Sequence, residues 1–410
     1  MRRLKAISLY TGIGGLDYGF EAAGFRTAVG LEIDETACSV LRANRKWPLL
    51  QGDISALSSR SILTTAGIRA GEADVLIGGP PCQPFSKAGN WNLDADRHML
   101  DPRATTLREY LRVLGDTRPE AYLLENVPGL AHRQENAGLE FILSEIAAVN
   151  KRCGTNYGVS THLVNAADYG VPQLRERLFL VGFRDGRPFV APQPTHCANL
   201  VSNSELAPHI TAWDAIGDLD ADLEESLELS GKWCDLLPSI PEGQNYLWHT
   251  RKGGGARLFG WRTRYWNFLL KLAKNKPSWT IPAQPGPAIG PFHWRNRRLS
   301  IRELCRLQTI PDSLRVACSR TTAQKLIGNA VPSLLAEVFA SAIRSELLNC
   351  NRIRRRPLAL AVSPRGSTPR ATRVSVIPEK YLELQGCHDD HPGAGLGRGA
   401  VRWRRNATAA

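Results

Sequence analysis

The chain has 410 residues, a hydrophobic fraction of 43% and a charged fraction of 22%, as in a globular protein of two domains, and no stretch resembles a membrane span of about 18 uncharged apolar residues. The nine cysteines are scattered without a Cys-x-x-Cys pair, which argues against a disulfide framework or a zinc site and favours a reducing cytoplasm. The net charge of +13 indicates an anionic partner, although a solvated basic tail would give the same excess.

The N-terminal part alternates between strand-like and helix-like segments, beginning with MRRLKAISLY, which predicts a strand rather than a signal peptide. Short apolar runs predict strands at 5–10, 27–33, 74–79, 121–127 and 177–183. Helical spacing of apolar residues predicts helices at 16–25, 36–45, 107–114 and 139–149. We therefore expect an α/β fold with a doubly wound, mostly parallel sheet, in which ligands bind beyond the carboxyl ends of the strands.

The alternation of strand-like and helix-like segments ends after about residue 186. Prolines become frequent, and seven of the ten tryptophans fall between residues 187 and 296, which predicts a smaller, irregular domain. Helical periodicity returns at 297–350, which we expect to rejoin the first domain, residues 1–186. Residues 351–410 hold twelve Lys and Arg against four Asp and Glu, with few apolar residues, and predict a basic, disordered tail with little role in catalysis.

A glycine-rich segment, SLYTGIGGLDYGF (8–20), lies between the first strand and the first helix. Glycines let the backbone turn sharply and approach a ligand at the helix N-terminus. The spacing is not G-x-G-x-x-G, because Asp17 occupies the position of the third glycine, and this disfavours a cofactor with a pyrophosphate. A purely structural tight turn is the alternative.

Two carboxylates close the following strands. Glu32 could accept hydrogen bonds from both ribose hydroxyls, and Asp53 from an adenine amino group, with Ile33 and Ile54 against the ring. A nucleoside cofactor without a pyrophosphate suits this set, and S-adenosylmethionine is such a cofactor.

A single thiol follows a predicted strand in the stiff loop GGPPCQPFS (78–86). Glu125 and Asn126 end the next strand, so the thiol of Cys82 and a carboxyl are expected side by side over the sheet. A lone cysteine is usually an inert packing residue, so the loop needs the rest of the chain to support a catalytic interpretation.

That support comes from a resemblance. GGPPCQPFS, LLENVPG, PQLRERLFLVGF (172–183), RRLSIRELCRLQTIPD and GNAVP (328–332), in this order, resemble the DNA (cytosine-5)-methyltransferase family of bacterial restriction-modification systems. The resemblance covers about residues 5–185 and 297–348. It implies a sequence-specific enzyme that uses S-adenosylmethionine on double-stranded DNA and could have a separately encoded restriction endonuclease as a partner. The cysteines predict a cytoplasmic protein without a metal, the apolar runs are too short to cross a membrane, and one active site within one chain predicts a monomer.

The resemblance also assigns catalytic roles. The Cys82 thiolate would add to carbon 6 of a cytosine rotated out of the duplex, which makes carbon 5 nucleophilic, while Glu125 holds a proton at N3. Arg177 would face O2, Arg175 would support the thiol loop and contact phosphate, and Asn126 would brace the chain before the thiol. A surface ion pair with Glu176 is the alternative for the two arginines.

Further assignments by resemblance concern the cofactor and DNA. Cofactor contacts are implied for Tyr10, Gly12, Ile13, Gly14, Pro81, Asn329 and Val331. Two positions depart from the family pattern, Thr106 where an apolar residue is usual and Tyr10 where Phe is usual. Gln83 and Ser86 would contact the opened duplex. Residues 187–296 would recognise the target, with phosphate and base contacts expected from Arg251, Lys252, Arg257, Arg262 and Arg264.

Two other functions stay open at this point. A tRNA cytosine-5 methyltransferase of the same fold would share the chemistry, although the Gln-Pro-Phe-Ser loop and the large variable domain favour duplex DNA. A non-catalytic DNA-binding relative is the other alternative, and the set of Cys82, Glu125 and Arg177 argues against it. Most of the tryptophans are expected in the core of the irregular domain rather than in contact with DNA.

Overall fold

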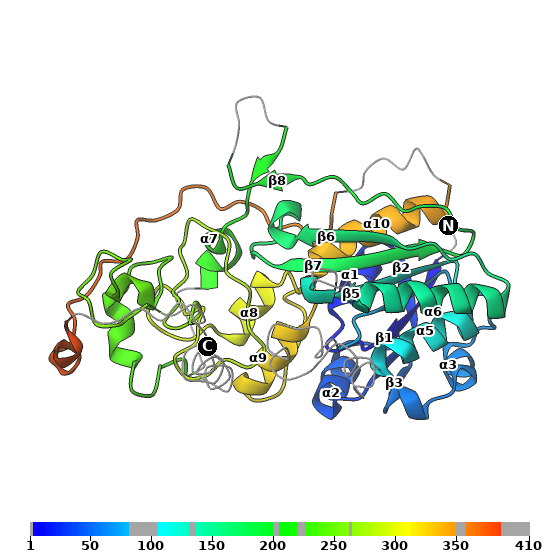
Figure 1. Ribbon diagram of the computed structural model, residues 1–410, viewed down its shortest axis with the longest axis horizontal. Coiled ribbons are helices and arrows are strands. Elements are labelled where there is room, and N and C mark those ends of the chain that lie inside the picture. The colour runs from blue at the N-terminus through cyan, green and yellow to red at the C-terminus, as the bar shows by residue number, and fades with distance from the viewer. Residues whose placement is uncertain are drawn as a thin grey trace, which may run out of the picture.

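The computed structural model describes residues 3–81, 105–130, 137–199, 205–219, 226–261, 265–349 and 357–386. Two lobes lie side by side (Figure 1). The sheet lobe comprises residues 3–186 and 297–349, and the insert lobe comprises residues 205–296. The chain enters the insert lobe past two short paired strands, β8 (His196–Cys197) and β9 (Ala207–Pro208).

The sheet lobe is built on seven strands in the order β3-β2-β1-β4-β5-β7-β6. Their bounds are β1 Leu4–Leu9, β2 Phe25–Glu32, β3 Leu49–Gln51, β4 Val75–Gly78, β5 Ala121–Asn126, β6 Ser160–Asn165 and β7 Glu176–Phe183. The first five strands run parallel, and β7 is antiparallel to both of its neighbours. The strand order reverses between β1 and β4, which is where ligands bind in such sheets.

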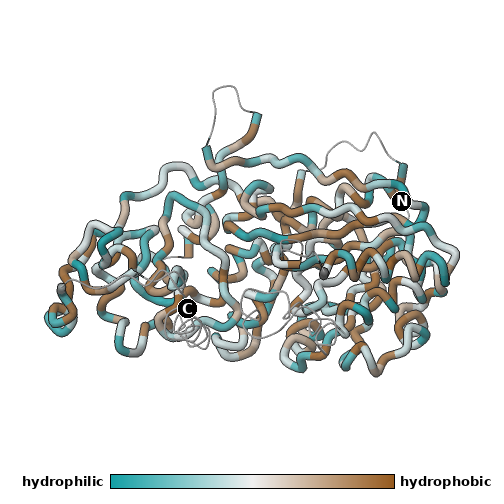
Figure 2. Tube along the Cα trace, in the orientation of Figure 1, coloured by the Kyte–Doolittle hydropathy of each residue, from teal (hydrophilic) through white to brown (hydrophobic). Residues whose placement is uncertain are grey.

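Helices cover both faces of this sheet. Their bounds are α1 Gly15–Ala22, α2 Glu35–Asn44, α3 Ser59–Ala66, α5 Thr105–Thr117, α6 Ala137–Cys153 and α10 Ser333–Leu347. Apolar side chains of α3, α5 and α6 share one core with the sheet, and those of α1 and α10 share another. The apolar strands run between these layers in Figure 2. The expected doubly wound α/β fold is confirmed. Its central strands are continuous apolar runs in the sequence because they are buried on both faces.

Helix α10 returns to the beginning of the chain through glycine contacts. A Cβ at Gly15 would lie 2.5 Å from the carbonyl oxygen of Val331, and one at Gly19 would lie 2.5 Å from the Cβ of Ala336. Only glycine permits this approach, so the first and last helices of the lobe pack with their backbones almost in contact.

The helical segment 320–347 is long and apolar enough for a membrane span, but 78% of its most apolar window is buried inside the protein. Two helices make it up, α9 (Arg320–Asn329) and α10, and an extended residue, Ala330, separates them. Pro332 is the N-cap of α10, because a proline is tolerated at the start of a helix but not in its interior. Its apolar residues serve the core.

The insert lobe has little regular structure beyond α7 (Ala212–Ile216) and short 3-10 turns. Its core is aromatic, with the rings of Trp233, Tyr246, Phe259 and Phe268 in mutual edge and tilted contacts. A junction core joins the lobes, with Tyr18 of α1 beside residues of α7, α8 (Ile301–Leu307) and α9.

One expectation is wrong. Residues 357–386, hereafter the C-terminal strap, pack along both lobes instead of forming part of a disordered tail. Leu358 and Leu360 contact the core around α10, and Tyr381 is 2% exposed within the insert-lobe core. Composition suggested disorder because residues 351–410 are basic and rich in proline and glycine, but Leu358, Leu360 and Tyr381 of the strap pack into cores made by other segments. Helix α3 and strand β6 were not expected from the sequence either.

Candidate active site

The glycine-rich turn after β1 follows a left-handed path. Tyr10, Gly12 and Gly14 have φ of 53°, 58° and 87°, and Gly14 is the N-cap of α1. Glycine adopts such angles at no steric cost, whereas a tyrosine there is strained. The turn leaves the N-terminus of α1 at the point where the strand order reverses.

Glu32 holds this turn against the end of β2. Its carboxylate accepts hydrogen bonds from the backbone N–H groups of Gly12 at 2.7 Å, Ile33 at 2.9 Å and Asp34 at 2.8 Å. The sequence indicated only a ligand contact for Glu32, and this structural role was missed. Two carboxylate oxygens have about four acceptor positions, so the side chain retains capacity for a ribose hydroxyl.

The surroundings of Glu32 suit a nucleoside. Ile33 is 63% exposed beside Glu32 and offers an apolar surface on which a ring could stack. Asp53 is exposed and caps the 3-10 turn Ile54–Ala56, and its hydrogen bonds from Ser55 lower its pKa. The expectation for Ile54 needs correction, because its side chain lies in the core at 4% exposure and cannot cover a ring.

The other cofactor-side residues sit around the same turn. Ile13 is buried, so only its backbone is available to a ligand. Asn329 is exposed at the end of α9, and the backbone of Val331 lies against Gly15. Gln308 supports this turn by donating a hydrogen bond to the carbonyl of Ile327 at 2.9 Å, a role that the sequence did not indicate.

The chain leading to the thiol passes over Glu125. The expected nucleophile Cys82 and the loop residues Gln83 and Ser86 lie outside the described residues, which reach Pro81. A Cβ at Gly79 would lie 2.8 Å from Oε2 of Glu125, so glycine is needed for the chain to pass the carboxyl. The Asn126 side-chain amide donates to the carbonyl of Pro80 at 3.3 Å. That contact has the form expected of a brace for this segment.

Glu125 is paired with Arg177 from the neighbouring antiparallel strand. The Arg177 Nε lies 2.6 Å from Glu125 Oε1, and each side chain is 12% exposed. Burial raises the pKa of the Glu125 carboxyl above its ordinary value, and the guanidinium groups of Arg177 and Arg175 oppose that rise. Arg177 makes no ion pair with Glu176. Its only hydrogen bond to that residue goes to the backbone carbonyl.

Arg175 lies elsewhere than expected. Its guanidinium is 2% exposed and donates to the carbonyls of Gly328 at 2.7 Å and Ala330 at 3.1 Å. A phosphate contact is therefore excluded by burial. The side chain instead holds the turn before α10, and sequence alone could not reveal this because the partners are main-chain atoms more than 150 residues away.

Thr106 joins the glycine-rich turn to the thiol segment. The Tyr10 hydroxyl donates to the backbone carbonyl of Thr106 at 2.5 Å, and the Thr106 hydroxyl donates to the carbonyl of Pro81 at 3.1 Å. Both positions are ones where the sequence departs from the family pattern. The link connects β1, α5 and the residue before Cys82.

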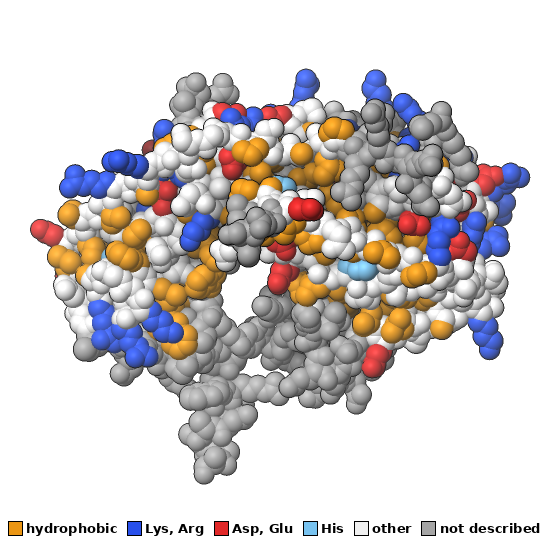
Figure 3. All heavy atoms as spheres, turned by 90° about the horizontal axis from the view of Figure 1, so that it is seen from above, with side chains coloured by type: hydrophobic (Ala, Val, Ile, Leu, Met, Phe, Trp, Pro, Cys, Tyr) orange, Lys and Arg blue, Asp and Glu red, His pale blue; other side chains and the backbone are white. Residues whose placement is uncertain are grey.

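The expected DNA-binding residues lie partly in the described chain. Residues 251–257, hereafter the basic loop, wrap the ring of Trp248, because a Cβ at Gly254 would lie 2.8 Å from it. Arg251 and Lys252 are exposed, and Arg257 is half-buried. Lys252 Nζ lies 3.4 Å from the ring centroid of Trp261. Arg262 and Arg264 lie outside the described residues. On the face in Figure 3, Lys and Arg lie mainly around the edge.

These groups together suit addition to an electron-poor ring. A carboxyl with a raised pKa donates a proton to a ring nitrogen, and a guanidinium beside it stabilises charge on a neighbouring oxygen. Among the residues that the structure describes, no group of three or more His, Cys, Asp or Glu could hold a metal ion.

Known proteins resemble the chain over most of its length. The family model of C-5 cytosine-specific DNA methylases matches residues 4–345. The Type II methyltransferase M.SacI of Streptomyces achromogenes is 37% identical over 84% of this chain and 93% of its own. The Type II methyltransferase M1.HphI of Haemophilus parahaemolyticus is 34% identical over 83% of this chain and 86% of its own.

Solved structures share the fold at lower identity. A protein described as a DNA modification methyltransferase of an E. coli prophage has a TM-score of 0.58 at 23% identity, covering 84% of this chain and 99% of that one. A DNMT2 variant of Spodoptera frugiperda has a TM-score of 0.55 at 17% identity, covering 83% and 99%. With the family match over residues 4–345, the chain belongs to the C-5 cytosine-specific DNA methylases and is a DNA (cytosine-5)-methyltransferase.

Proposed function

We propose that this enzyme methylates one cytosine within a short duplex DNA sequence, with Cys82 as nucleophile and S-adenosylmethionine as methyl donor. The observation that carries the proposal is the buried pair of Glu125 and Arg177, 2.6 Å apart, directly beside the chain that enters the thiol loop. A buried carboxyl and guanidinium beside this loop favour a catalytic role for Cys82 over a packing role. It suits a ring that must accept a proton on one atom and negative charge on the next.

The reaction begins with a bond between the Cys82 sulfur and carbon 6 of cytosine. The electron pair of the C5–C6 double bond moves toward N3 and O2, where Glu125 supplies a proton to N3 and Arg177 stabilises O2. Carbon 5, now enamine-like, would take the methyl group from the sulfonium sulfur of the donor, and the broken sulfur–carbon bond would leave its electron pair on that sulfur. N3 then returns its proton to Glu125. A base then removes the proton from carbon 5, the C6–S bond breaks, and the thiolate leaves with the electron pair of that bond.

The environment of Glu125 suits its role. Its carboxyl must be protonated when the base is bound, and burial raises its pKa in that direction. The guanidinium of Arg177 opposes this rise and stabilises the ionised carboxylate of Glu125 between turnovers. Asn126 holds the Pro80 carbonyl, so the chain before Cys82 has a fixed path over the carboxyl.

S-adenosylmethionine, when bound, would supply an electrophilic methyl group. Residues on this chain fit its nucleoside, with Glu32 for the ribose, Asp53 for the adenine amino group and exposed Ile33 for the ring. Asn329, exposed at the end of α9, is a further candidate contact for the cofactor.

Relatives named Type II methyltransferases support a role in restriction-modification, with a separate endonuclease as partner. The target base is unreachable within a duplex, so the enzyme rotates it out of the stack. The insert lobe recognises the sequence through the basic loop. We expect a cytoplasmic monomer, because the groups of the site come from one chain.

The test is bisulfite sequencing of mixed-sequence duplex DNA after incubation with the enzyme and S-adenosylmethionine. We expect protected cytosines at one short recurrent sequence and none with Cys82→Ala, because the addition step needs the thiolate. Glu125→Gln keeps the shape of the carboxyl but cannot give up a proton, and we expect its turnover to fall by about 100-fold or more. Cofactor binding by both variants, measured by calorimetry, serves as the control for folding.

The comparisons do not favour the tRNA alternative, and the same assay addresses it. A folded enzyme that binds the cofactor, leaves every duplex cytosine unprotected and methylates tRNA would contradict the proposal. Covalent trapping on duplex DNA containing 5-fluorocytosine excludes a non-catalytic relative, because the fluorinated carbon 5 has no proton to lose.

A further inference from the structure

The C-terminal strap lies beyond the family match at residues 4–345 and runs from the sheet lobe to the insert lobe. We propose that the strap is a positioning element for DNA recognition, which ties the insert lobe to the sheet lobe and holds the basic loop. The proposal rests on the proposed function, because it takes the insert lobe as the part that reads DNA.

The strap begins on the sheet lobe. Glu337 of α10 is 3% exposed, and its two carboxylate oxygens accept hydrogen bonds from the backbone N–H groups of Ala359 at 2.7 Å and Leu360 at 2.9 Å. Burial raises the pKa of Glu337 above its ordinary value. A carboxyl in an apolar helix face needs hydrogen-bond partners, and the strap supplies them.

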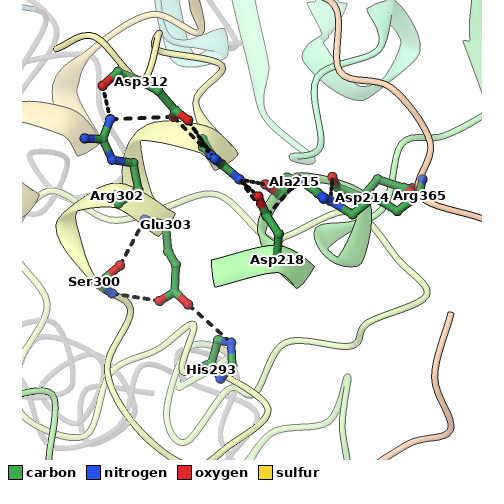
Figure 4. Close-up of polar contacts among 10 residues, drawn as sticks. Asp214, Ala215, Asp218, His293, Ser300, Arg302, Glu303, Asp312 and Arg365 are labelled. Atoms are coloured by element: carbon green, nitrogen blue, oxygen red, sulfur yellow. Dashed lines mark hydrogen bonds and ion pairs between the residues drawn. The ribbon is translucent and has the colours of Figure 1, made fainter. Parts of the chain in front are cut away.

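The strap next crosses the junction between the lobes. The Arg365 backbone N–H donates to Oδ1 of Asp214 at 2.8 Å, and its guanidinium lies 2.7 Å from Asp218. Asp218 also accepts from Arg306 of α8 at 2.6 Å, and Arg306 pairs with Asp312 at the same distance. Figure 4 shows Asp214 and Asp218 between Arg365 and the helix that carries Arg302 and Glu303. A network of alternating charges therefore joins strap, α7 and α8.

Beyond the junction the strap follows the insert lobe. Glu242 is ion-paired with Lys274, and it also accepts a hydrogen bond from the backbone N–H of Thr372 at 2.7 Å. The Lys274 ammonium donates in turn to the Thr372 hydroxyl at 3.1 Å. The backbone of Ser375 then donates to the carbonyl of Pro238 at 3.0 Å. These contacts join the strap to a pair that is itself largely buried.

The end of the strap reaches the basic loop. Tyr381 stacks on Trp233 with ring centroids 5.7 Å apart and planes 16° from parallel, and its hydroxyl donates to the carbonyl of Lys232 at 2.6 Å. The backbone N–H of Gly386 donates to the carbonyl of Arg257 at 3.1 Å. The strap thus spans from α10 to the loop expected on DNA, and its loss would free that loop relative to the active site.

The test uses full-length enzyme with single substitutions and compares KM for duplex DNA, kcat, and the dissociation constant of S-adenosylmethionine. Tyr381→Ala removes the stacked ring, and we expect KM for DNA to rise about tenfold, with cofactor affinity within about twofold of wild type. Tyr381→Phe keeps the stack and should recover most of the loss. The ratio of methylation at the target to methylation at single-base variants of it should fall with Tyr381→Ala.

A second variant avoids the buried ring. Arg365→Ala cuts the junction network at a partly exposed position, and we expect a KM for DNA about threefold above wild type with unchanged cofactor affinity. Lys380→Ala is the matched control, since its ion pair with Asp235 is more than half exposed on both sides and should leave KM unchanged.

The outcomes separate positioning from plain stabilisation. If Arg365→Ala and folded Tyr381→Ala lower the melting temperature while KM for DNA and target preference stay at wild-type values, the strap only stabilises the protein and the proposal is overturned. A wild-type enzyme that methylates no duplex DNA contradicts the proposed function, and with it the proposal, before any strap variant is compared.

Discussion

Thr106 is a single residue that links the glycine-rich turn to the end of the described chain before Cys82. Its backbone carbonyl accepts from the Tyr10 hydroxyl, and its own hydroxyl donates to the carbonyl of Pro81. The position of Pro81 thus depends on a helix residue with no reactive group of its own. Residues of this kind are invisible in a motif, because what matters is a hydroxyl at the right place rather than a reactive group.

Thr106→Val keeps the shape of the side chain and removes the hydroxyl. We expect kcat to fall about 2- to 5-fold, as for the loss of one modest hydrogen bond, with cofactor affinity little changed. Thr106→Ser retains the hydroxyl and is the control. The alkylation rate of Cys82 by iodoacetamide, followed with and without S-adenosylmethionine, reports the position of the thiol directly. Equal kinetics for the valine and serine variants would refute the link.

Asp17 is a buried carboxyl outside the chemistry. It accepts hydrogen bonds from Ser8 at 3.0 Å and Thr27 at 2.9 Å, and burial raises its pKa from 3.8 to about 6. The folded protein therefore holds this proton more tightly than the unfolded chain does. The stability that the protonated group provides is present below about pH 4 and is lost as the pH rises through about 6.

Asp17→Asn removes this titration. Between pH 5 and pH 7 the free energy of unfolding of wild type should fall by about 1 kcal/mol relative to the variant, which carries no charge at either pH. Urea unfolding at the two pH values measures the difference. A constant difference between the two proteins across this range would show that Asp17 does not titrate as its burial implies.

At the scale of elements, the pairing of α1 with α10 closes the sheet lobe. Gly19 faces the backbone of α10, with Ser333 O and Glu337 N each 2.5 Å from where a Cβ would lie. Backbone atoms cannot swing aside as a side chain can. The helices therefore have one approach distance, and this distance sets the position of the turn that places Val331 against Gly15.

Gly19→Ala should therefore separate the two helices. We expect a loss of about 2 kcal/mol in the free energy of unfolding and weaker cofactor binding, because overpacking at a helix contact is costly. Gly115→Ala in α5 is the matched control. Its new methyl group would lie 2.7 Å from the flexible end of Arg152, and alanine has a higher helix propensity than glycine. Urea unfolding and calorimetry compare the pair, and equal losses in both variants would count against the contact.

At the scale of the whole molecule, much of the sheet lobe was predictable. Its central strands are buried on both faces, so they are continuous apolar runs, and its helices carry a clear periodicity. The candidate site residues at strand ends followed from topology, as Glu32 and Glu125 show. The remaining site residues were predicted from the order of the motifs along the chain, which carried the family resemblance.

What the sequence could not reveal depends on single long-range contacts. The buried guanidinium of Arg175 binds main-chain carbonyls, and no residue type marks those partners. The strap is anchored by Glu337 and by Trp233, each a lone residue in a segment with its own apparent role. Composition averages over such anchors, and therefore a basic segment rich in proline and glycine was expected to be disordered.

The partnership of α1 and α10 also constrains the order of events during synthesis. More than 300 residues separate Ala22 from Ser333, and at about 5–20 residues per second the ribosome needs roughly 15–60 s to make them. During that time α1 presents its glycine face to solvent or to chaperones. The first half of the sheet is therefore made long before α10, and the contact of Gly15 and Gly19 with the last helix of the lobe cannot form until almost the whole chain has been synthesised.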